Sequence, residues 1–498
     1  MLQIMNELIK KKIIVIFLIS LTFGNCVNND YTIPEDIEVQ DFVWKGFNAY
    51  YLYQDEIPDL SDRRFNSNQQ LESYLKGFET PVNLFNSLVL PTDLRSTLIE
   101  DHSILDLPIP KRSSNTNGLE FGIFKTPIFP NNLIGYVSHV LPSSYASDQD
   151  ISRGEFFYAI LNEDLDIILF TEDNYEELLI NYQQDTLKLL MADFDGNSLI
   201  ANNKRVDLVK KSYQYPPIFM EKTMDYNSQK IGYLMYNNDF SKNYIEDLNA
   251  TMLDFKNELV EKLIIDLRYN IGQDSYAETI AEIASMLTGQ FAGETLIKEN
   301  WNLKAQSWFE QNQPDSLITR FSSKLYNSQP INGLNLTDVY LILNGNNFEG
   351  SSAIELLINS LQPYINVHVI GNKTKGDNLG SITLYDSPDY DFFGKKSTHS
   401  FALQPSVLTF TNLNDESYEN GLSPVIELCS QEDPLNLGIL GEITDPILNQ
   451  VLNYISGNAG INIPCNPFDF EIIYNSIDSQ RPLDKGIFIK QDLPNLGR

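Results

Sequence analysis

The sequence is poor in cysteine and histidine, and its basic residues are far outnumbered by acidic ones. Its 498 residues include only 3 cysteines and 4 histidines, and 35 lysines and arginines stand against 67 aspartates and glutamates. The formal net charge of −32 repels a phosphate backbone, which argues against a nucleic-acid partner. The histidines lack the spacing of metal ligands, so we predict no metal site and no cofactor. They are His102, His139, His399 and His368, the last in a strand-like segment that favours a partly buried, hydrogen-bonded imidazole.

The chain also lacks an apolar run long enough to cross a membrane comfortably. Its one such run, residues 13–23, has about eleven apolar residues, whereas a membrane span needs about 20. Lys10, Lys11 and Lys12 precede the run, and a basic segment before a short apolar one is typical of a secretory signal. We therefore predict that residues 1–25 are a signal peptide and that the protein is exported.

Cys26 directly follows this signal. A cysteine at this position resembles the acceptor of bacterial lipoproteins, so we predict lipidation at Cys26 and attachment to the membrane of the cell envelope. A plain signal peptide or a retained anchor is the alternative. The other two cysteines, Cys429 and Cys465, either pair in the exported chain or remain separate buried thiols.

Composition and patterning indicate a folded protein with more than one domain. Apolar residues make up 42% of the chain, which is enough to build real cores. We assign residues 26–112 to a tether and a helical N-terminal region, because apolar positions recur there at helical spacing. Residues 111–118, KRSSNTNG, have the composition of a linker.

Residues 113–212 are rich in short β-type runs. The order GLEFGIF, then a small-residue segment, then ISRGE before another strand resembles a PDZ domain. In PDZ domains, backbone N–H groups of a Gly-Leu-x-Phe loop receive the terminal carboxylate of a peptide, and the adjacent strand edge pairs with that peptide. The resemblance implies peptide binding by Gly118, Leu119, Phe121 and Gly122. An ordinary small β-sandwich is the alternative.

From residue 213 to residue 456, strand-like runs alternate with helical runs. This order predicts an α/β domain with a largely parallel sheet. One helix is expected over residues 244–262, with Leu259 on its apolar face. Because the carboxyl ends of parallel strands share one edge of a sheet, the loops that follow them are expected to converge on a site. These loops are residues 269–274, 344–351 and 371–379.

Three motifs of this domain resemble the tail-specific, or C-terminal processing, family of serine peptidases. They are DLRYNIG at 266–272, GSSAIE at 350–355 and GNKTKGDNLGS at 371–381. With the flanking segments TGQF, INSLQPYI and GSITLYDSP, they are similar to the exported lipoprotein branch of the family in Bacteroidetes-type bacteria. The resemblance covers residues 37–456, and we assign no role to the C-terminal tail, residues 457–498.

The resemblance implies a serine–lysine dyad, in which a buried neutral lysine takes the proton of the attacking serine. The nucleophile corresponds to Ser352, at the expected start of a helix whose N–H groups and dipole favour an oxyanion. A lone serine in such a place is otherwise a helix N-cap. The implied oxyanion region comprises Gly272, Asn270 and Ala353.

The chain departs from the family at two positions. Asp377 aligns with the family lysine, and Gln273 replaces the second glycine after the first motif. A carboxylate, with an ordinary pKa of about 4, is a far weaker base than a neutral lysine. Lys373 and Lys375 are nearby, and Lys375 is the alternative base, although both precede the aligned position.

Three functions are compatible with these features. The first is an exported serine peptidase that acts on C-termini of unfolded or periplasmic polypeptides, with Ser352 as nucleophile and Lys375 or Asp377 as base. The second is a degenerate lipoprotein that binds polypeptide C-termini without cleaving them. The third is a glycan-capturing or structural surface lipoprotein, and its mark would be an exposed aromatic platform. Trp301 and Trp308 are the late tryptophans that would build it, and we expect them to pack against the protein or to cover the cleft instead.

Overall fold

The computed structural model describes most of the chain. Among the described residues, no helix is both long and apolar enough to cross a membrane. Cys429 is disulfide-bonded, so the alternative of a free thiol at this position is wrong. The predicted signal, Cys26, Gln273 and Cys465 lie outside the described residues, which are 33–105, 112–238, 240–272, 275–343, 350–429, 432–458, 470–480, 486–489, 493–494 and 496.

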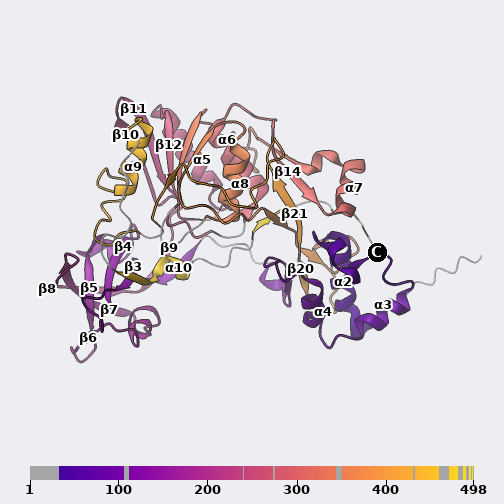
Figure 1. Ribbon diagram of the computed structural model, residues 1–498, viewed down its shortest axis with the longest axis horizontal. Helices are drawn as coiled ribbons and strands as arrows, with labels where there is room; N and C mark the ends of the chain where they lie inside the picture. Colours follow the sequence, from indigo (N-terminus) through magenta and orange to yellow (C-terminus); the bar gives the residue numbers. More distant parts are fainter. Residues whose placement is uncertain are drawn as a thin grey trace, which may run out of the picture.

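The N-terminal region is helical, as predicted, and lies at the opposite end of the molecule from the β-rich module (Figure 1). Ser67 and Thr80 cap helices α3 and α4 by accepting hydrogen bonds from backbone N–H groups of the first turn. Most of α2 is buried in the largest core of the protein. The elements are η1 (Glu35–Ile37), α2 (Glu38–Tyr50), η2 (Gln54–Glu56), η3 (Pro58–Leu60), α3 (Asn68–Leu75), α4 (Pro81–Leu88) and η4 (His102–Ile104).

The β-rich module is an antiparallel sheet in the order β23-β3-β4-β5-β7-β8, with β6 paired to β5. A short π-helix, η6 (Glu176–Ile180), contributes Leu179 to the core of this module. The edge strand β23 comes from the C-terminal tail. The other elements are β3 (Leu119–Lys125), β4 (Ile134–Val140), η5 (Ala146–Asp148), β5 (Phe156–Leu161), β6 (Ile167–Leu169), β7 (Thr186–Phe194), β8 (Leu199–Val209) and β23 (Glu471–Asn475).

Part of the predicted linker 111–118 is a strand. β2 (Ser113–Thr116) pairs in antiparallel fashion with β9 (Lys211–Gln214). The chain segments that enter and leave the module therefore form one two-stranded ribbon. Both strands of this ribbon are largely exposed, and an exposed strand needs no apolar alternation. Polar composition alone therefore did not distinguish this strand from a linker.

The α/β domain has the largely parallel sheet that the alternating pattern predicts. Strands β11, β12, β16, β17 and β22 pair in parallel, and β10 joins in antiparallel fashion at one edge. Helices α5, α6 and α8 cover one face and α9 covers the other, so both faces are buried (Figure 1). The elements are β10 (Met220–Tyr226), β11 (Gln229–Met235), α5 (Ile245–Asn257), β12 (Lys262–Asp266), α6 (Ala277–Thr288), β16 (Asp338–Ile342), α8 (Ser352–Leu361), β17 (Asn366–Gly371), β22 (Ile426–Glu427) and α9 (Pro446–Ile455).

The helix expected over residues 244–262 is shorter than predicted. α5 ends at Asn257, and Leu259 has a φ of +61° and is 75% exposed. A left-handed residue cannot continue a right-handed helix, and the chain reverses here into β12. Helical periodicity predicted that Leu259 is buried, but the helix has already ended at this position.

A second six-stranded sheet has the order β13-β24-β18-β21-β14-β15. Strand β24 of the C-terminal tail lies in parallel between β13 and β18. The tail therefore contributes strands to two different sheets. A three-stranded sheet, β1-β20-β19, joins the N-terminal region to this part of the fold. The elements are β1 (Thr97–Ile99), β13 (Ser275–Tyr276), β14 (Thr295–Trp301), α7 (Leu303–Asn312), η7 (Pro314–Leu317), β15 (Ile318–Arg320), β18 (Leu379–Ser381), β19 (Leu384–Tyr385), β20 (Ala402–Gln404), β21 (Ser406–Thr411), α10 (Ser476–Gln480) and β24 (Ile487–Phe488).

A buried network of charges joins the β-rich module to the α/β domain. Arg153 of the module donates to Glu432 over 2.7 Å, and Arg268, just after β12, donates to the same carboxylate over 3.0 Å. Arg268 is 0% exposed and also pairs with Asp266 and with Asp445, the N-cap of α9. Burial raises the pKa of Glu432, but the two guanidinium groups outweigh burial and hold this pKa at about 2. Glu432 is therefore charged in the folded protein at neutral pH.

Replacing Glu432 with Gln tests this network. Arg153 would then be buried without its paired carboxylate, whereas Arg268 would keep Asp266 and Asp445. The free energy of unfolding at pH 7 is therefore expected to fall by about 3 to 5 kcal/mol. Because the folded pKa is depressed, the contribution of Glu432 is fully present above pH 4.5 and is lost as the pH falls toward 2. Urea unfolding of wild type and Glu432→Gln should show a stability difference that narrows below pH 4.5. A difference independent of pH would contradict the charged state of Glu432.

Candidate active site

The candidate nucleophile begins a helix. α8 starts at Ser352, and Ser351 stands at the N-cap with an extended backbone. Ser352 is therefore the first helical residue and not the N-cap itself. Its side chain lies in the field of the helix N-terminus, where first-turn N–H groups favour negative charge. The residue is buried, with 1% of its surface exposed.

The three loops expected at the carboxyl edge of the sheet meet at this helix start. A Cβ built on Gly272 would lie 3.3 Å from the Cβ of Ser351. A Cβ built on Gly350 would lie 3.8 Å from Cγ2 of Thr374. Each approach joins two of the predicted loops, so their convergence is confirmed by direct packing.

Ser352 is hydrogen-bonded to the residue that aligns with the family lysine. Its Oγ donates to Oδ2 of Asp377 over 2.7 Å. Arg95 forms an ion pair with the same carboxylate, and its Nη2 lies 3.2 Å from Ser352 Oγ. The side chains of Arg95 and Asp377 are 8% and 6% exposed. Ser352, Asp377 and Arg95 thus form one buried group, which we call the serine cluster.

Arg95 was not among the residues predicted for the site. It lies 257 positions before Ser352, in the turn after α4, and no motif marks it. The carboxylate of Asp93 shapes this turn by accepting the backbone N–H groups of Arg95 and Ser96 over 2.9 and 3.1 Å. The hydroxyl of Ser406 in β21 donates to Asp93 over 3.0 Å, which fixes the turn against the second sheet. The Asp93–Ser96 pattern is a turn signal, but it does not reveal where Arg95 points.

Glu355 holds the loop that carries Asp377. Its carboxylate is 0% exposed and accepts the backbone N–H groups of Gly376 over 2.6 Å and of Asp377 over 2.8 Å. Because Glu355 lies almost one helical turn after Ser352, the helix and the loop are joined close to the serine hydroxyl. The carboxylate of Asp377 is therefore held in place through its own backbone.

Of the predicted oxyanion residues, Gly272 packs against Ser351, whereas Asn270 is hydrogen-bonded within the turn after β12. The amide nitrogen of Asn270 donates to the backbone carbonyls of Tyr236 and Asn238. Its Oδ1 accepts the N–H of Gly272 over 2.9 Å, so this N–H is already hydrogen-bonded. Asn270 thus shapes the turn after β12. Ala353, which is buried, follows Ser352 in the first turn of α8.

Of the other residues considered from the sequence, the lysines are exposed and the tryptophans pack against the protein. Lys375 and Lys373 are both exposed, whereas Ser352 is buried. Trp301 is 6% exposed and packs against Phe309, with 5.1 Å between ring centroids. Trp301 therefore belongs to the packed interior and does not build an exposed aromatic platform. Trp308, which also contacts Phe309, is partly buried.

A strand of the C-terminal tail lies beside the serine cluster. β24 pairs with β13, which follows the loop of Gly272, and with β18, which follows Asp377. Ile489 donates its backbone N–H to the carbonyl oxygen of Ser381 over 3.1 Å. A Cβ built on Gly486 would lie 3.9 Å from Cδ of Arg95. The chain thus places its own extended segment next to Arg95 of the serine cluster.

Of the predicted peptide-binding residues, Gly118 lies in the bend before β3, and Leu119, Phe121 and Gly122 lie on this strand and not in an open loop, which corrects the expectation. Gly118 has a φ of +89°, and a Cβ there would lie 2.0 Å from Oγ of Ser144, so this position requires glycine. From Leu119 the chain is strand β3, because its apolar residues face the core of the module. Leu119 and Phe121 are 5% and 8% exposed, and Gly122 is also buried.

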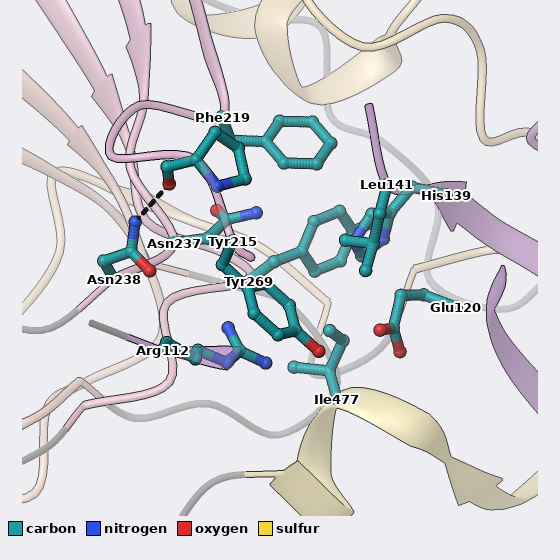
Figure 2. Close-up of a pocket in the computed structure, with 11 residues that line it drawn as sticks. Arg112, Glu120, His139, Leu141, Tyr215, Phe219, Asn237, Asn238, Tyr269 and Ile477 are labelled. Carbon is teal, nitrogen blue, oxygen red and sulfur yellow. Dashed lines mark hydrogen bonds between the residues drawn. The ribbon is translucent and has the colours of Figure 1, made fainter. Parts of the chain in front are cut away.

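A small cavity lies between the β-rich module and the α/β domain (Figure 2). Its volume of about 10 Å³ has room for about one water molecule and not for a peptide. His139 and Tyr269 stack in its wall with 4.4 Å between ring centroids. Burial, reinforced by Arg153, lowers the pKa of His139 to about 3, so this imidazole is neutral. Ile477 lines the cavity from the C-terminal tail.

His368 has a structural role, and the histidine, cysteine and acidic side chains that the structure describes form no metal site. His368 is hydrogen-bonded to Asp338 and to Tyr454, each over 3.1 Å, which confirms the interpretation of a partly buried, hydrogen-bonded imidazole. Within the described part of the chain, no group of three or more His, Cys, Asp or Glu side chains is arranged to hold a metal ion.

Two family models match the chain. The Peptidase S41 N-terminal domain matches residues 38–102, which include Arg95, and Peptidase family S41 matches residues 230–419, which include Ser352 and Asp377. None of the curated proteins searched matches the chain. A crystal structure of a candidate S41 protease from Bacteroides fragilis is 23% identical, covers 84% of this chain and 98% of that chain, and has a TM-score of 0.59, which shows a shared fold. The photosystem II D1 C-terminal processing protease is 14% identical over 84% of this chain and 100% of that chain, with a TM-score of 0.44.

Gly421 tests how tightly the loop of Asp377 is packed. It has a φ of +75°, and a Cβ there would lie 2.0 Å from the carbonyl oxygen of Thr374. Gly457 is the matched control, because its φ of +74° is similar and a Cβ there would meet no atom within 4 Å. We expect Gly457→Ala to cost about 1 kcal/mol through backbone strain. Gly421→Ala should cost about 1 to 3 kcal/mol more through the steric clash, as measured by thermal unfolding. Equal losses of stability in Gly421→Ala and Gly457→Ala would contradict the tight packing of this loop.

Proposed function

Because the chain belongs to peptidase family S41, we propose that it binds extended polypeptide segments at a peptidase-type site whose serine is poorly activated for hydrolysis. Polypeptides are the substrate class that membership of a peptidase family suggests. Because the serine is retained but the base is altered, the site would bind polypeptides without cleaving them rapidly.

The serine cluster is the observation that carries this proposal. Ser352 donates to Asp377 over 2.7 Å, where a base belongs, but Arg95 pairs with that carboxylate. A carboxylate has an ordinary pKa of about 4, and a neighbouring guanidinium favours the charged form, so the driving force for taking a serine proton at pH 7 is small. Arg95 cannot replace the base, because arginine stays protonated in proteins. The Asp377 carboxylate also places negative charge beside an oxyanion that would form during attack.

A slow serine peptidase is the second candidate, and the same hydrogen bond favours it. A 2.7 Å contact is within reach for proton transfer from Ser352 to Asp377. The Nη2 atom of Arg95, 3.2 Å from Ser352 Oγ, and the N-terminus of α8 would then stabilise the oxyanion of the tetrahedral intermediate.

A fluorophosphonate probe, which reacts with activated serines, separates the two candidates. We expect weak labelling of the wild type and no measurable cleavage of a reduced, unfolded protein, although that protein binds. Strong labelling that is abolished by Ser352→Ala would instead establish an activated nucleophile and the peptidase.

Recognition of polypeptide C-termini by the β-rich module is part of the proposal. Its support is that the edge of β3 accepts β23 as an added strand, together with the PDZ-like order of sequence motifs. PDZ domains add a peptide strand to such an edge. In this protein the polypeptide would be held by the module and led toward Ser352.

Asp377→Lys is expected to gain slow cleavage of an unfolded protein. The new amine would stand 25 positions after Ser352, and burial together with the positive charge of Arg95 would favour its neutral form. General-base assistance is worth about 10² to 10⁴ in rate, which is visible against a weak background. The matched control is Asp377→Lys combined with Ser352→Ala, which should not cleave. The proposal fails if the wild type already cleaves rapidly, or if Asp377→Lys folds normally yet neither cleaves nor reacts with the probe.

We also propose that the protein works outside the cytoplasm, attached to a membrane through Cys26. The support is the basic segment, the short apolar run and the cysteine that follows it. A single acyl chain binds membranes only marginally, whereas the several chains of a bacterial lipoprotein anchor it stably. Cys26→Ser should therefore move the protein from the membrane fraction to the soluble fraction of fractionated cells. An unchanged membrane fraction would argue against lipidation at Cys26.

A further inference from the structure

Strand β3 of the β-rich module is paired along both of its edges. β4 occupies one edge, and β23 of the C-terminal tail occupies the other, in a register from Glu471 opposite Lys125 to Asn475 opposite Gly122. β23 is the outermost strand of this sheet. The chain therefore extends its own sheet in the way that a peptide ligand does in strand addition.

Side chains of β23 fill the space between β3 and η6, which we call the module groove. The ring centroid of Tyr474 lies 5.6 Å from that of Phe121 on β3 and 6.4 Å from that of Tyr175, which directly precedes η6. Ile473 packs against the same core. The tail thus makes the apolar contacts that a bound peptide would make in this groove.

A polar contact fixes the end of β23. The hydroxyl of Ser476 accepts the backbone N–H of Phe121 over 2.9 Å and donates to the carboxylate of Glu120 over 2.6 Å. This N–H lies in the segment that the sequence assigns to peptide recognition. In the folded chain it is hydrogen-bonded to the tail.

The second strand of the tail supports the same interpretation independently. β24 adds a strand between β13 and β18, and Gly486, directly before it, approaches Arg95 of the serine cluster. Both strands of the tail therefore stand where an extended polypeptide would pair with the protein. One is in the module groove, and the other lies between β13 and β18, with Gly486 next to Arg95.

We propose that the C-terminal tail is an internal ligand of this protein, and that an external polypeptide binds in the module groove by displacing β23. This inference rests on the proposed function, because it names how the same polypeptide-binding site is regulated. The external ligand would be an extended segment with an apolar residue next to an aromatic one, as in Ile473-Tyr474. Main-chain hydrogen bonds would supply much of its affinity, so competition with the tail does not require an identical sequence.

Tethering makes the tail a strong competitor. A segment on the same chain acts at an effective concentration on the order of 1 mM. If an external segment binds the empty groove with a Kd of about 10 µM and the tail binds as well, its apparent affinity falls about 100-fold. Weakening β23 without removing the tail should recover most of this loss.

The first test compares Ile473→Asp/Tyr474→Ala with the wild type. The probe is a fluorescent synthetic peptide of residues 470–480, FEIIYNSIDSQ, and its binding is followed by anisotropy. We expect the double variant to bind this peptide at least about 10-fold more tightly than the wild type. Glu471→Gln is the matched control, because Glu471 is 67% exposed and pairs only at the surface with Lys125, so it should bind as the wild type does. A double variant that unfolds at the wild-type temperature and binds no more tightly would overturn the inference.

The second test locks the tail in place. Lys125 and Glu471 are register partners at the exposed end of the ladder, so Lys125→Cys/Glu471→Cys can join β23 to β3 by a disulfide. The oxidised variant is expected to lose binding of the peptide, and reduction should restore it. Wild type with and without reductant controls for the native disulfide at Cys429. Unchanged peptide binding by the locked variant would place the ligand elsewhere and overturn the inference.

An unfolded protein as a second probe separates this inference from the proposed function. The opened variant is Ile473→Asp/Tyr474→Ala. If it gains affinity for both the peptide and the unfolded protein, the inference and the proposed function are both supported. If it gains affinity for the peptide alone, the tail is an internal ligand but the protein is not a general polypeptide binder. If the wild type and the opened variant bind unfolded protein equally well, the proposed function stands and the inference falls.

Discussion

The ion pair between Arg95 and Asp377 governs the chemistry of this site. Both side chains are almost fully buried, and a buried ion pair is stable only when hydrogen bonds satisfy its remaining groups. The hydroxyl of Ser352 provides one of them. The consequence is that the serine is bound to a neutralised carboxylate and not to a free base. The candidate nucleophile is retained, but its hydroxyl is part of a structural contact.

This pair also connects distant parts of the chain. Arg95 belongs to the turn after the N-terminal helices, and Asp93 in the same turn is tied to Ser406 of the second sheet. Asp377 is held by Glu355 on the helix that begins with Ser352. The N-terminal region is thus a component of the site. Its family model and that of the peptidase domain together contain the whole serine cluster.

The C-terminal tail also connects distant parts of the chain. β23 completes the module, β24 completes the second sheet, and Ile477 between them lines the cavity beside Tyr269. Strand pairing depends on backbone groups that every polypeptide carries, so an edge that accepts one extended segment also accepts others. Under the proposed function, the tail of the chain satisfies these edges when no polypeptide ligand is bound.

Local patterns in the sequence determined much of the fold. Alternating helical and strand-like runs predicted the largely parallel sheet, and the shared edge of parallel strands predicted the convergence of three loops at Ser352. The resemblance to the peptidase family singled out Ser352 and Asp377, and the structure joins them by a hydrogen bond. Such inferences succeed because periodicity and motif spacing report interactions between neighbours or between consecutive elements. Leu259 and β2 were placed wrongly because a turn and an exposed strand leave weak patterns.

Only the tertiary structure decided which distant segments meet. The sequence holds Arg95 and the tail strands, but nothing near them indicates a partner, since Arg95 lies 257 positions from Ser352, and Phe121 lies 355 positions from Ser476. A guanidinium group can pair with many carboxylates, and a short strand can join any open edge. The choice among these partners depends on how whole layers pack, which buries one combination and leaves the others in water. The residues were therefore set by the sequence, and their pairing into a neutralised serine cluster and an occupied groove was set by the fold.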